Sequence, residues 1–274
     1  MLTPAQILEK TITVGEQKAN LKWWQMLVLG IFAGMFIALA ATGATFGNIY
    51  GGKIAGACIF TAGLAMVVVA GSELFTGNNL MLAALFDRRI GLVKLLKNWI
   101  LVFFGNFLGA LFVAAIVTLS GVFGPVSETV ITTASAKVNL PFFEAILRGV
   151  LCNVLVCIAV WMAFAANTVQ GKIAAVFLPV MLFVLCGFEH SVANMFYIPA
   201  GMFQGAFTGA AAPTILEFLL RNLLPVTIGN LIGGACLVAG GYYLVYHKTT
   251  RVESQPEAIA TTSHKTTKHK SKRA

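Results

Sequence analysis

Two stretches of the sequence share one pattern: GSELFTGN at residues 71–78 and GFEHSVAN at residues 187–194. Both read Gly-x-Glu-x-x-x-x-Asn, and each lies inside a long apolar segment. Glycine frees the backbone from helical geometry, while Asn, Ser and Thr side chains can satisfy the released N–H and C=O groups. Inside a membrane such backbone is tolerated only where it is buried in protein or lines a cavity. The pattern therefore predicts two broken helices around a selective pore.

The composition is that of a membrane protein. The 274 residues are 58% hydrophobic and only 11% charged, whereas roughly 25% charged residues is usual for a soluble domain. No Asp, Glu, Lys or Arg occurs in residues 23–52, 98–127, 149–171 or 222–247. Each stretch is long enough to cross a hydrocarbon core of ~30 Å. A secreted enzyme, a nucleic-acid-binding protein and a disulfide scaffold are excluded.

Six membrane-spanning segments are expected, and the second and fifth are too long for one straight helix. They are Met26–Gly47, Ile54–Phe86, Asn98–Ser120, Phe142–Ala166, Ile173–Ala206 and Leu223–Tyr246. Residues 1–22 are expected to form an amphipathic cytoplasmic helix, residues 23–247 the six-helix channel domain, and residues 248–274 a basic, disordered cytoplasmic tail.

The distribution of Lys and Arg predicts the orientation. Of the 19 cations, fifteen fall on the side of the two termini, and four fall on the other side: Lys53, Lys137, Arg148 and Arg221. The positive-inside rule then places both termini in the cytoplasm of a protein of the plasma (inner) membrane. The net charge of +9 is attributed to this topology and to the anionic lipid bilayer, not to a nucleic acid.

A second pair of motifs follows the first in the same order. Gly105-Asn106-Phe-Leu-Gly109 matches Gly229-Asn230-Leu-Ile-Gly233. Each half then holds three crossings, so the second half begins on the opposite side of the membrane. The expected fold is an all-α polytopic membrane protein with two inverted three-helix repeats, and such repeats place the permeation site near the midplane.

Three ionisable residues fall inside the apolar segments, where they are functional hypotheses by default. His190 is expected to be neutral at rest, able to donate a hydrogen bond or to pass a proton to a weak-acid anion; the alternative is a structural histidine tied into the loop. Glu73 and Glu189 are expected mainly to hold the breaks by accepting backbone N–H groups. Lys137, just before the fourth segment, is expected to attract anions.

The motifs resemble those of the formate–nitrite transporter family. The resemblance rests on residues 71–78 and 187–195, on Arg148-Gly-Val-Leu-Cys-Asn153 and on Pro225-Val-Thr-Ile-Gly-Asn230. It implies a homopentamer of aquaporin-like protomers, each with its own pore for a small monovalent anion.

The resemblance also implies roles for single residues. His190 corresponds to the central histidine, Thr76 to its partner and Lys137 to the vestibule lysine, and the polar residues near the centre are Asn153, Asn194 and Asn230. The outer apolar slit is assigned to Phe60, Leu64 and Phe183, and the inner slit to Leu74, Phe75 and Val156. In a straight fifth helix Phe183 lies on the inner side, so its assignment requires the break to cross the midplane.

Formate is the expected substrate, with nitrite and hydrosulfide as alternatives, and a proton-coupled carrier is the alternative to a passive channel. An aquaporin-like channel for neutral solutes is disfavoured, since neither break contains Asn-Pro-Ala. A haem protein is disfavoured because the segments contain a single histidine. No enzyme activity, cofactor or metal is expected.

Overall fold

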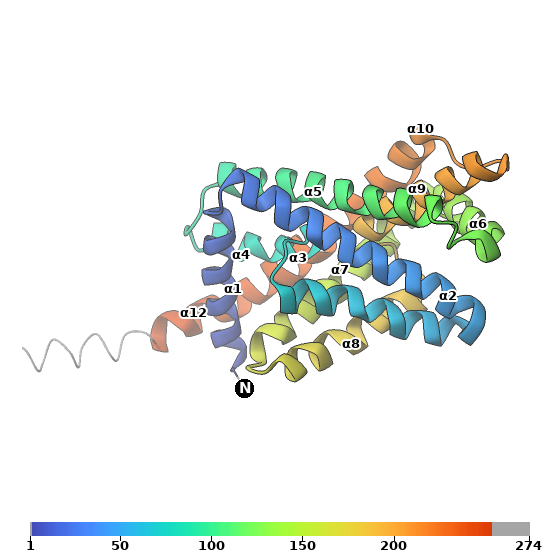
Figure 1. The fold of residues 1–274 in the computed structure, drawn as a ribbon. Helices are drawn as coiled ribbons and strands as arrows, with labels where there is room; N and C mark the ends of the chain where they lie inside the picture. The colour runs from blue at the N-terminus through green and yellow to red at the C-terminus, as the bar shows by residue number, and fades with distance from the viewer. Residues whose placement is uncertain (1, 254–274) are drawn as a thin grey trace, which may run out of the picture.

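The computed structural model describes residues 2–253, with the backbone alone for residues 248–253, and every regular element in this range is helical (Figure 1). The elements are α1 (Pro4–Ala19), α2 (Trp23–Ala70), α3 (Phe75–Asn78), η1 (Asn79–Met81), α4 (Leu82–Phe86), α5 (Leu92–Leu119), η2 (Gly124–Val126), α6 (Ser127–Val138), α7 (Phe142–Ala165), α8 (Val169–Leu185), α9 (Ser191–Thr208), α10 (Ile215–Glu217), η3 (Phe218–Leu223), α11 (Leu224–Leu231), η4 (Ile232–Gly240) and α12 (Gly241–Glu253).

The first two expected segments are joined by a very short turn. Gly52 has φ 77° and ψ 175° inside the 48 residues of α2, a conformation that favours glycine. The chain folds back there, so that residues 23–51 and 53–70 run side by side (Figure 1). From the sequence, a longer connection was expected between Gly47 and Ile54.

Both long segments break where the repeated pattern lies. α2 ends at Gly71, which has φ 77°, and α3 begins only at Phe75. α8 ends at Leu185, Gly187 has φ 69°, and α9 begins at Ser191. Each break therefore begins at a glycine in the left-handed region and ends at the start of a new helix.

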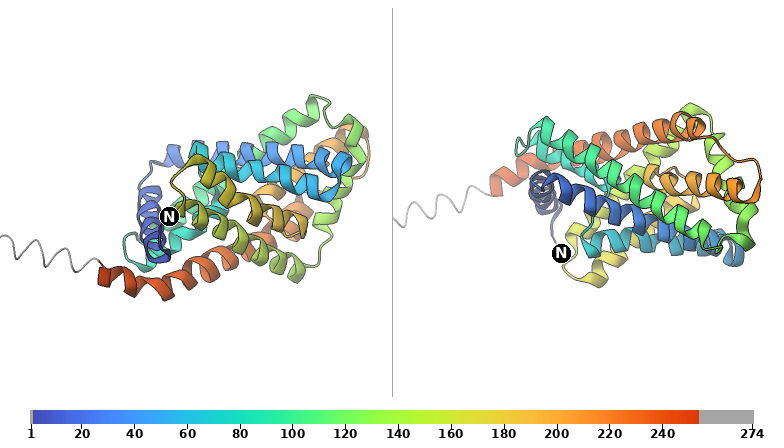
Figure 2. Two further views of the ribbon diagram at one scale, coloured as in Figure 1. Left: turned by 90° about the horizontal axis from the view of Figure 1, so that it is seen from below. Right: turned by 45° about the horizontal axis from the view of Figure 1, so that its top comes forward.

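Two shorter helices cover opposite ends of the bundle. α1 lies across the end where α12 emerges, and α6 lies at the other end (Figures 1 and 2). α1 buries Ile7, Leu8 and Ile12 in an apolar cluster with Met81 and Ala84. α6 was not anticipated from the sequence; its Ala134 fits against Gly201 of α9, where a Cβ would collide with it.

The last membrane helix is longer than expected. It begins at Ile215 instead of Leu223 and continues, through the π-helical segments η3 and η4, to Glu253. Six residues of the expected tail are thus helical. Residues 254–274 of that tail lie outside the described part of the chain.

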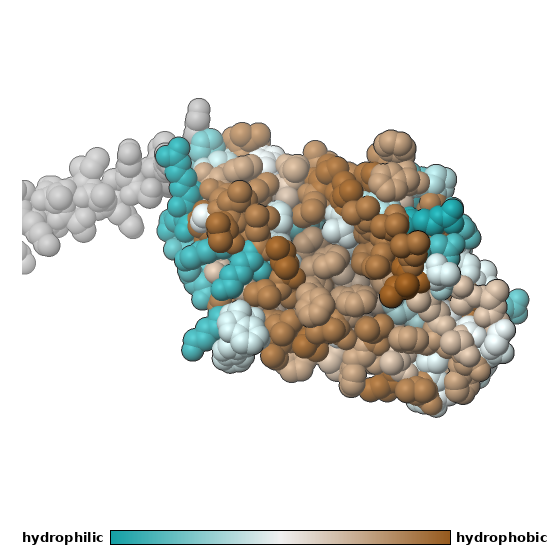
Figure 3. All heavy atoms as spheres, turned by 90° about the horizontal axis from the view of Figure 1, so that it is seen from above, coloured by the Kyte–Doolittle hydropathy of each residue, from teal (hydrophilic) through white to brown (hydrophobic). Residues whose placement is uncertain are grey.

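The bundle has the dimensions and surface of a membrane protein. Four helical runs in the described residues are long and apolar enough to cross a membrane: Trp23–Ala70, Leu92–Leu119, Phe142–Ala165 and Ile215–His247. The face seen in Figure 3 is largely hydrophobic, and hydrophilic side chains gather toward its ends.

Small residues let the helices approach closely. Gly30 of α2 lies against Gly105 of α5, and Gly149 of α7 lies against Gly229 of α11. A Cβ on Gly229 would collide with the carbonyl oxygen of Ile146. Such small-residue contacts are typical of helix packing in membranes.

Candidate functional site

The two breaks bring together one polar side chain from each. His190 is the N-cap of α9, and its Nδ1 accepts a hydrogen bond from the N–H of Ala193 at 3.0 Å. Its Nε2 lies 2.8 Å from Oγ1 of Thr76 in α3. Since Nδ1 acts as an acceptor, the proton of the neutral ring is on Nε2 and is donated to Thr76. Thr76 is 0% and His190 3% exposed, so the pair is sealed inside the bundle.

Aromatic rings cover the histidine on one side. The ring of Phe183 stacks on that of His190 with centroids 5.8 Å apart, and Phe60 meets Phe183 edge-on, also at 5.8 Å. All six residues assigned to the two slits are buried in one apolar cluster: Phe60, Leu64, Leu74, Phe75, Val156 and Phe183. These apolar side chains offer an ion no hydrogen bonds.

A cavity approaches this cluster from each end. The α6-side cavity, of about 180 Å³, is lined by Phe60, Phe183 and His190 together with Lys137. Phe183 thus lies beside Phe60, as its assignment to the outer slit requires. The position of the cavity next to His190 makes it one half of a candidate pathway.

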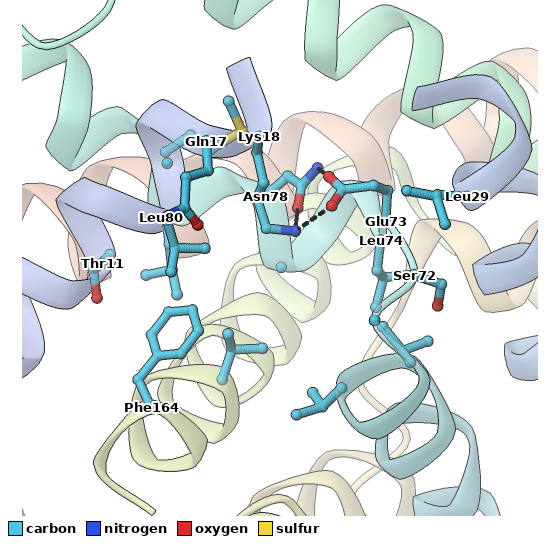
Figure 4. Close-up of a pocket in the computed structure, with 18 of the residues that line it drawn as sticks. Thr11, Gln17, Lys18, Leu29, Ser72, Glu73, Leu74, Asn78, Leu80 and Phe164 are labelled. Carbon is cyan, nitrogen blue, oxygen red and sulfur yellow. Dashed lines mark hydrogen bonds and ion pairs between the residues drawn. The ribbon is translucent and has the colours of Figure 1, made fainter. Parts of the chain in front are cut away.

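The α1-side cavity, of about 350 Å³, is lined by Leu64, Leu74, Val160 and polar residues of α1 and α3 (Figure 4). Leu64 was assigned to the same slit as Phe60, yet it lines this other cavity. Phe60 and Leu64 are one turn of helix apart, and the apolar cluster that separates the two cavities lies between them. The candidate pathway therefore runs from one cavity to the other past Thr76 and His190.

Beside the α1-side cavity, a lysine neutralises the first buried glutamate. Lys18 Nζ donates to Oε1 of Glu73 at 2.7 Å and to Oδ1 of Asn78 at 2.9 Å (Figure 4). Asn78 Nδ2 donates to Oε2 of Glu73 at 2.7 Å and to Oδ1 of Asn98 at 2.9 Å. Asn98 Nδ2 in turn donates a hydrogen bond to the backbone oxygen of Lys18 at 3.3 Å. α1 is thereby tied to the first break.

The second break has the same arrangement beside the α6-side cavity. Lys137 Nζ donates to Oε1 of Glu189 at 2.8 Å. Asn194 Nδ2 donates to Oε2 of Glu189 at 2.6 Å and to Oδ1 of Asn222 at 2.7 Å. Asn222 Nδ2 donates to the backbone oxygen of Lys137 at 2.9 Å. α6 thus holds the second break as α1 holds the first.

These contacts differ from those expected for Glu73 and Glu189. Lys137, which was expected to attract anions, has a side chain that is 17% exposed and paired with Glu189. The glutamates accept hydrogen bonds from lysine and asparagine side chains instead of backbone N–H groups. The reason is that a buried carboxylate is very costly unless a cation and hydrogen bonds compensate it.

The backbone of each break is held by an asparagine of the neighbouring helix. Asn106 Oδ1 accepts from the N–H of Phe75 at 2.9 Å, and Asn106 Nδ2 donates to the carbonyl of Glu73 at 2.8 Å. Asn230 makes the matching contacts, with the N–H of Ser191 at 2.9 Å and the carbonyl of Glu189 at 3.0 Å. These amides take the role that was expected of the glutamates.

The other two asparagines assigned to the centre also have partners in the protein. Asn153 Nδ2 donates to the carbonyl oxygens of Asn230 at 2.6 Å and Thr76 at 3.3 Å. It therefore braces the residue that contacts His190. Asn194 lines the α6-side cavity.

Sequence reasoning did not select Lys18, Asn98 or Asn222. A signal for the two asparagines exists: Asn98 and Asn222 precede Asn106 and Asn230 by the same number of residues. Lys18 gives no such signal, because its pairing with Glu73 depends on how α1 packs. No group of three or more His, Cys, Asp or Glu suited to a metal occurs among the side chains that the structure describes, those of residues 2–247.

A helical bundle with two interrupted helices, a buried polar pair and a cavity on either side is the architecture of a membrane transport protein. A family model described as "Formate/nitrite transporter" matches residues 5–244. The chain belongs to the formate/nitrite transporter family.

Individual relatives agree with this assignment. The formate channel FocA of Haemophilus influenzae is 38% identical over 264 residues, which are 86% of this chain and 92% of the relative. FocA of Escherichia coli K12 is 38% identical over 90% of this chain and 95% of its own. An uncharacterized transporter, YrhG, of Bacillus subtilis is 39% identical over 94% and 98%.

Solved structures match the fold as well. A structure described as a pentameric formate channel with formate bound superposes with a TM-score of 0.72 at 32% identity, over 82% of this chain and 97% of that one. An ion channel of the same family gives a TM-score of 0.76 at 27% identity, over 88% and 98%.

Proposed function

We propose that the protein is a channel for a small monovalent weak-acid anion, with formate as its substrate. The observation that carries the proposal is the Thr76–His190 pair between two cavities. The similarity to proteins named formate channels favours formate over nitrite and hydrosulfide.

The central pair offers two hydrogen-bond donors to an anion. At rest, Nε2–H of His190 is donated to Thr76. An arriving carboxylate can take the place of Thr76 as the acceptor of Nε2–H. The O–H of Thr76, which accepting from His190 does not use, can donate to the same anion. Formate has two acceptor oxygens, one for each donor. Both donors stand in an apolar surrounding, where hydrogen bonds to a charged group are strong.

Of the two roles considered for His190, donation of a hydrogen bond fits the geometry better than transfer of a proton. Nδ1 is occupied as the N-cap acceptor of α9, so a second proton on the ring requires that bond to break. Giving up the only ring proton leaves an imidazolate, which burial strongly disfavours. A proton that crosses with the anion therefore comes from solvent and not from this ring.

The two lysines act differently toward an anion. Lys18 donates to both Glu73 and Asn78, whereas among the described residues Lys137 has one hydrogen-bond acceptor, Glu189. Lys137 also lies 5.4 Å from the ring centre of Tyr197. An ammonium has three N–H donors, so Lys137 retains donors for an anion in the α6-side cavity.

We further propose that the two halves are inverted repeats of six membrane helices, with both termini in the cytoplasm and the protein in the plasma membrane. The matching side-chain contacts of Glu73 and Glu189, and the position of α1 and α6 at opposite ends, support this arrangement (Figure 1). The pentameric structure to which the chain is similar supports a homopentamer.

The proposal is tested by uptake of formate, nitrite and hydrosulfide into proteoliposomes between about pH 5 and about pH 8. His190→Asn is the informative variant, because its amide can cap α9 and donate a hydrogen bond but cannot titrate. We expect formate uptake that His190→Asn retains and His190→Leu loses.

Other outcomes separate the alternatives. If formate uptake by His190→Asn no longer depended on pH, the histidine would act as a proton donor. Uptake that follows the pH gradient and ignores the formate gradient would indicate a proton-coupled carrier. Passage of water or glycerol without any of the three anions would contradict the proposed function.

A further inference from the structure

Three exposed lysines lie where α2 and α5 begin, at the end of the bundle that α1 covers. Lys22 is the N-cap of α2, and Lys94 and Lys97 lie in the first two turns of α5. Lys94 Nζ donates to Oδ1 of Asn20 at 2.6 Å, which ties the start of α5 to the α1–α2 turn. The three ammonium groups therefore share one small region, the lysine patch (Lys22, Lys94 and Lys97).

The charge of the lysine patch is not compensated. Within residues 2–247, whose side chains the structure describes, none of its lysines forms an ion pair, and the nearby acidic residues Glu9, Glu16 and Asp87 all pair with Arg89. Uncompensated positive charge at a membrane surface attracts anionic lipid, with about 1 kcal/mol per basic residue.

Among the residues that the structure describes, the opposite end of the bundle has no such patch. Since Asn222 matches Asn98 in its contacts, the residue before it, Arg221, matches Lys97, and Arg221 pairs with Glu217 at 3.3 Å. Pro141 is the N-cap of α7, where α2 has Lys22. The patch is therefore specific to one end and not a by-product of the internal similarity.

Large apolar side chains surround the lysine patch. Trp23 is 59%, Trp24 48% and Val93 81% exposed, and Leu92 and Leu96 are exposed as well. Tryptophan is enriched where a membrane protein meets the lipid headgroups. Figure 3 shows a largely hydrophobic face with hydrophilic residues toward its ends. Cationic groups beside exposed apolar groups complement both parts of a phospholipid.

We propose that the lysine patch binds the headgroup of an anionic phospholipid, whose acyl chains lie on the exposed apolar side chains of α2 and α5. In the proposed topology this is a lipid of the cytoplasmic leaflet; the choice of leaflet rests on the proposed function, whereas the binding of the headgroup does not. An acidic soluble protein fits less well, because the exposed apolar side chains beside the patch suit the acyl chains of a lipid.

The test compares two double variants that remove the same charge. Lys22→Gln/Lys97→Gln removes part of the patch and spares Lys94, which holds Asn20. Lys53→Gln/Lys172→Gln is the control, since Lys53 follows the fold-back at Gly52 and Lys172 lies in the first turn of α8. Binding of phosphatidylglycerol and of phosphatidylcholine to each purified protein in detergent is measured by native mass spectrometry.

We expect the patch variant to bind phosphatidylglycerol roughly 25-fold more weakly, about fivefold for each lysine. The control variant should bind phosphatidylglycerol as the wild type does. Neither double variant should change the binding of phosphatidylcholine. Lys22→Arg/Lys97→Arg, which keeps both positive charges, should bind phosphatidylglycerol as the wild type does. That result would show that the glutamine variant loses binding because it loses charge and not because it misfolds. Equal loss in both double variants, or no loss in either, overturns the proposal whatever the transport assay shows.

Discussion

Among single residues, Thr76 is the partner that fixes the proton of His190. Thr76→Val keeps the shape but leaves the Nε2–H of His190 buried without an acceptor, at a cost of about 1–3 kcal/mol. It also removes the second donor to the anion. We expect formate uptake to fall about tenfold or more in Thr76→Val and to survive in Thr76→Ser, both measured in proteoliposomes. Wild-type uptake by the valine variant would show that the hydroxyl has no role in permeation.

The buried ion pairs lead to a second prediction at the residue scale. Lys18→Met leaves the carboxylate of Glu73, whose side chain is 6% exposed, without its cation. Breaking such a pair typically costs about 3 kcal/mol. The double variant Lys18→Met/Glu73→Gln should lose less, because no unpaired charge remains.

These stabilities are measured as free energies of unfolding in detergent micelles. The exposed pair Arg221–Glu217 is the control, and Arg221→Gln should cost less than about 0.5 kcal/mol. If the double variant of Lys18 and Glu73 proved less stable than either single change, the pair would be stabilising as an ion pair and not merely as a neutralised charge.

At the scale of elements, glycine decides how closely the helices pack. The space at Gly229 is filled by the carbonyl of Ile146, while a Cβ on Gly241 meets open space. Gly229→Ala must push α11 away from α7 and displace Asn230, which holds the second break. Gly241→Ala, in the same helical run, should leave stability unchanged or raise it by up to about 1 kcal/mol. The two variants are compared by their thermal unfolding temperatures and by their formate uptake. If Gly229→Ala matched Gly241→Ala in both measurements, tight packing at Gly229 would be contradicted.

The parts of the fold that the sequence predicted are those with a local signature. The breaks at residues 71–78 and 187–194 were predicted because glycine and asparagine recur there at fixed spacing within apolar runs. α6 was missed since its Thr- and Ser-rich sequence has no long apolar run, and the fold-back at Gly52 depends on one residue.

The site was predicted in part for the same reason. The meeting of Thr76 with His190 was expected from the family resemblance, and the broken helices bring the two together. The pairing of Lys18 with Glu73, and of Lys137 with Glu189, joins residues far apart in the chain. Such pairs follow from how α1 and α6 dock, which no local pattern records.

For the whole molecule, the decisive feature is that one chain contains the complete candidate pathway. Both cavities, both lysine–glutamate pairs and the Thr76–His190 contact are formed by residues of a single protomer. In the proposed pentamer each protomer should therefore conduct independently. An oligomer with one shared central path would instead depend on every subunit at once.

Mixed oligomers separate these two cases. Wild-type and Thr76→Val chains, carrying different affinity tags, are expressed together, and oligomers of known composition are purified and reconstituted. Because every wild-type protomer brings its own pair of donors, formate uptake per oligomer should fall in direct proportion to the fraction of Thr76→Val chains. The same oligomers made with Gly241→Ala in place of Thr76→Val control for effects of co-assembly, and their uptake should not fall. A steep loss after the first variant chain would place the conducting path between subunits and would remove the Thr76–His190 pair from it.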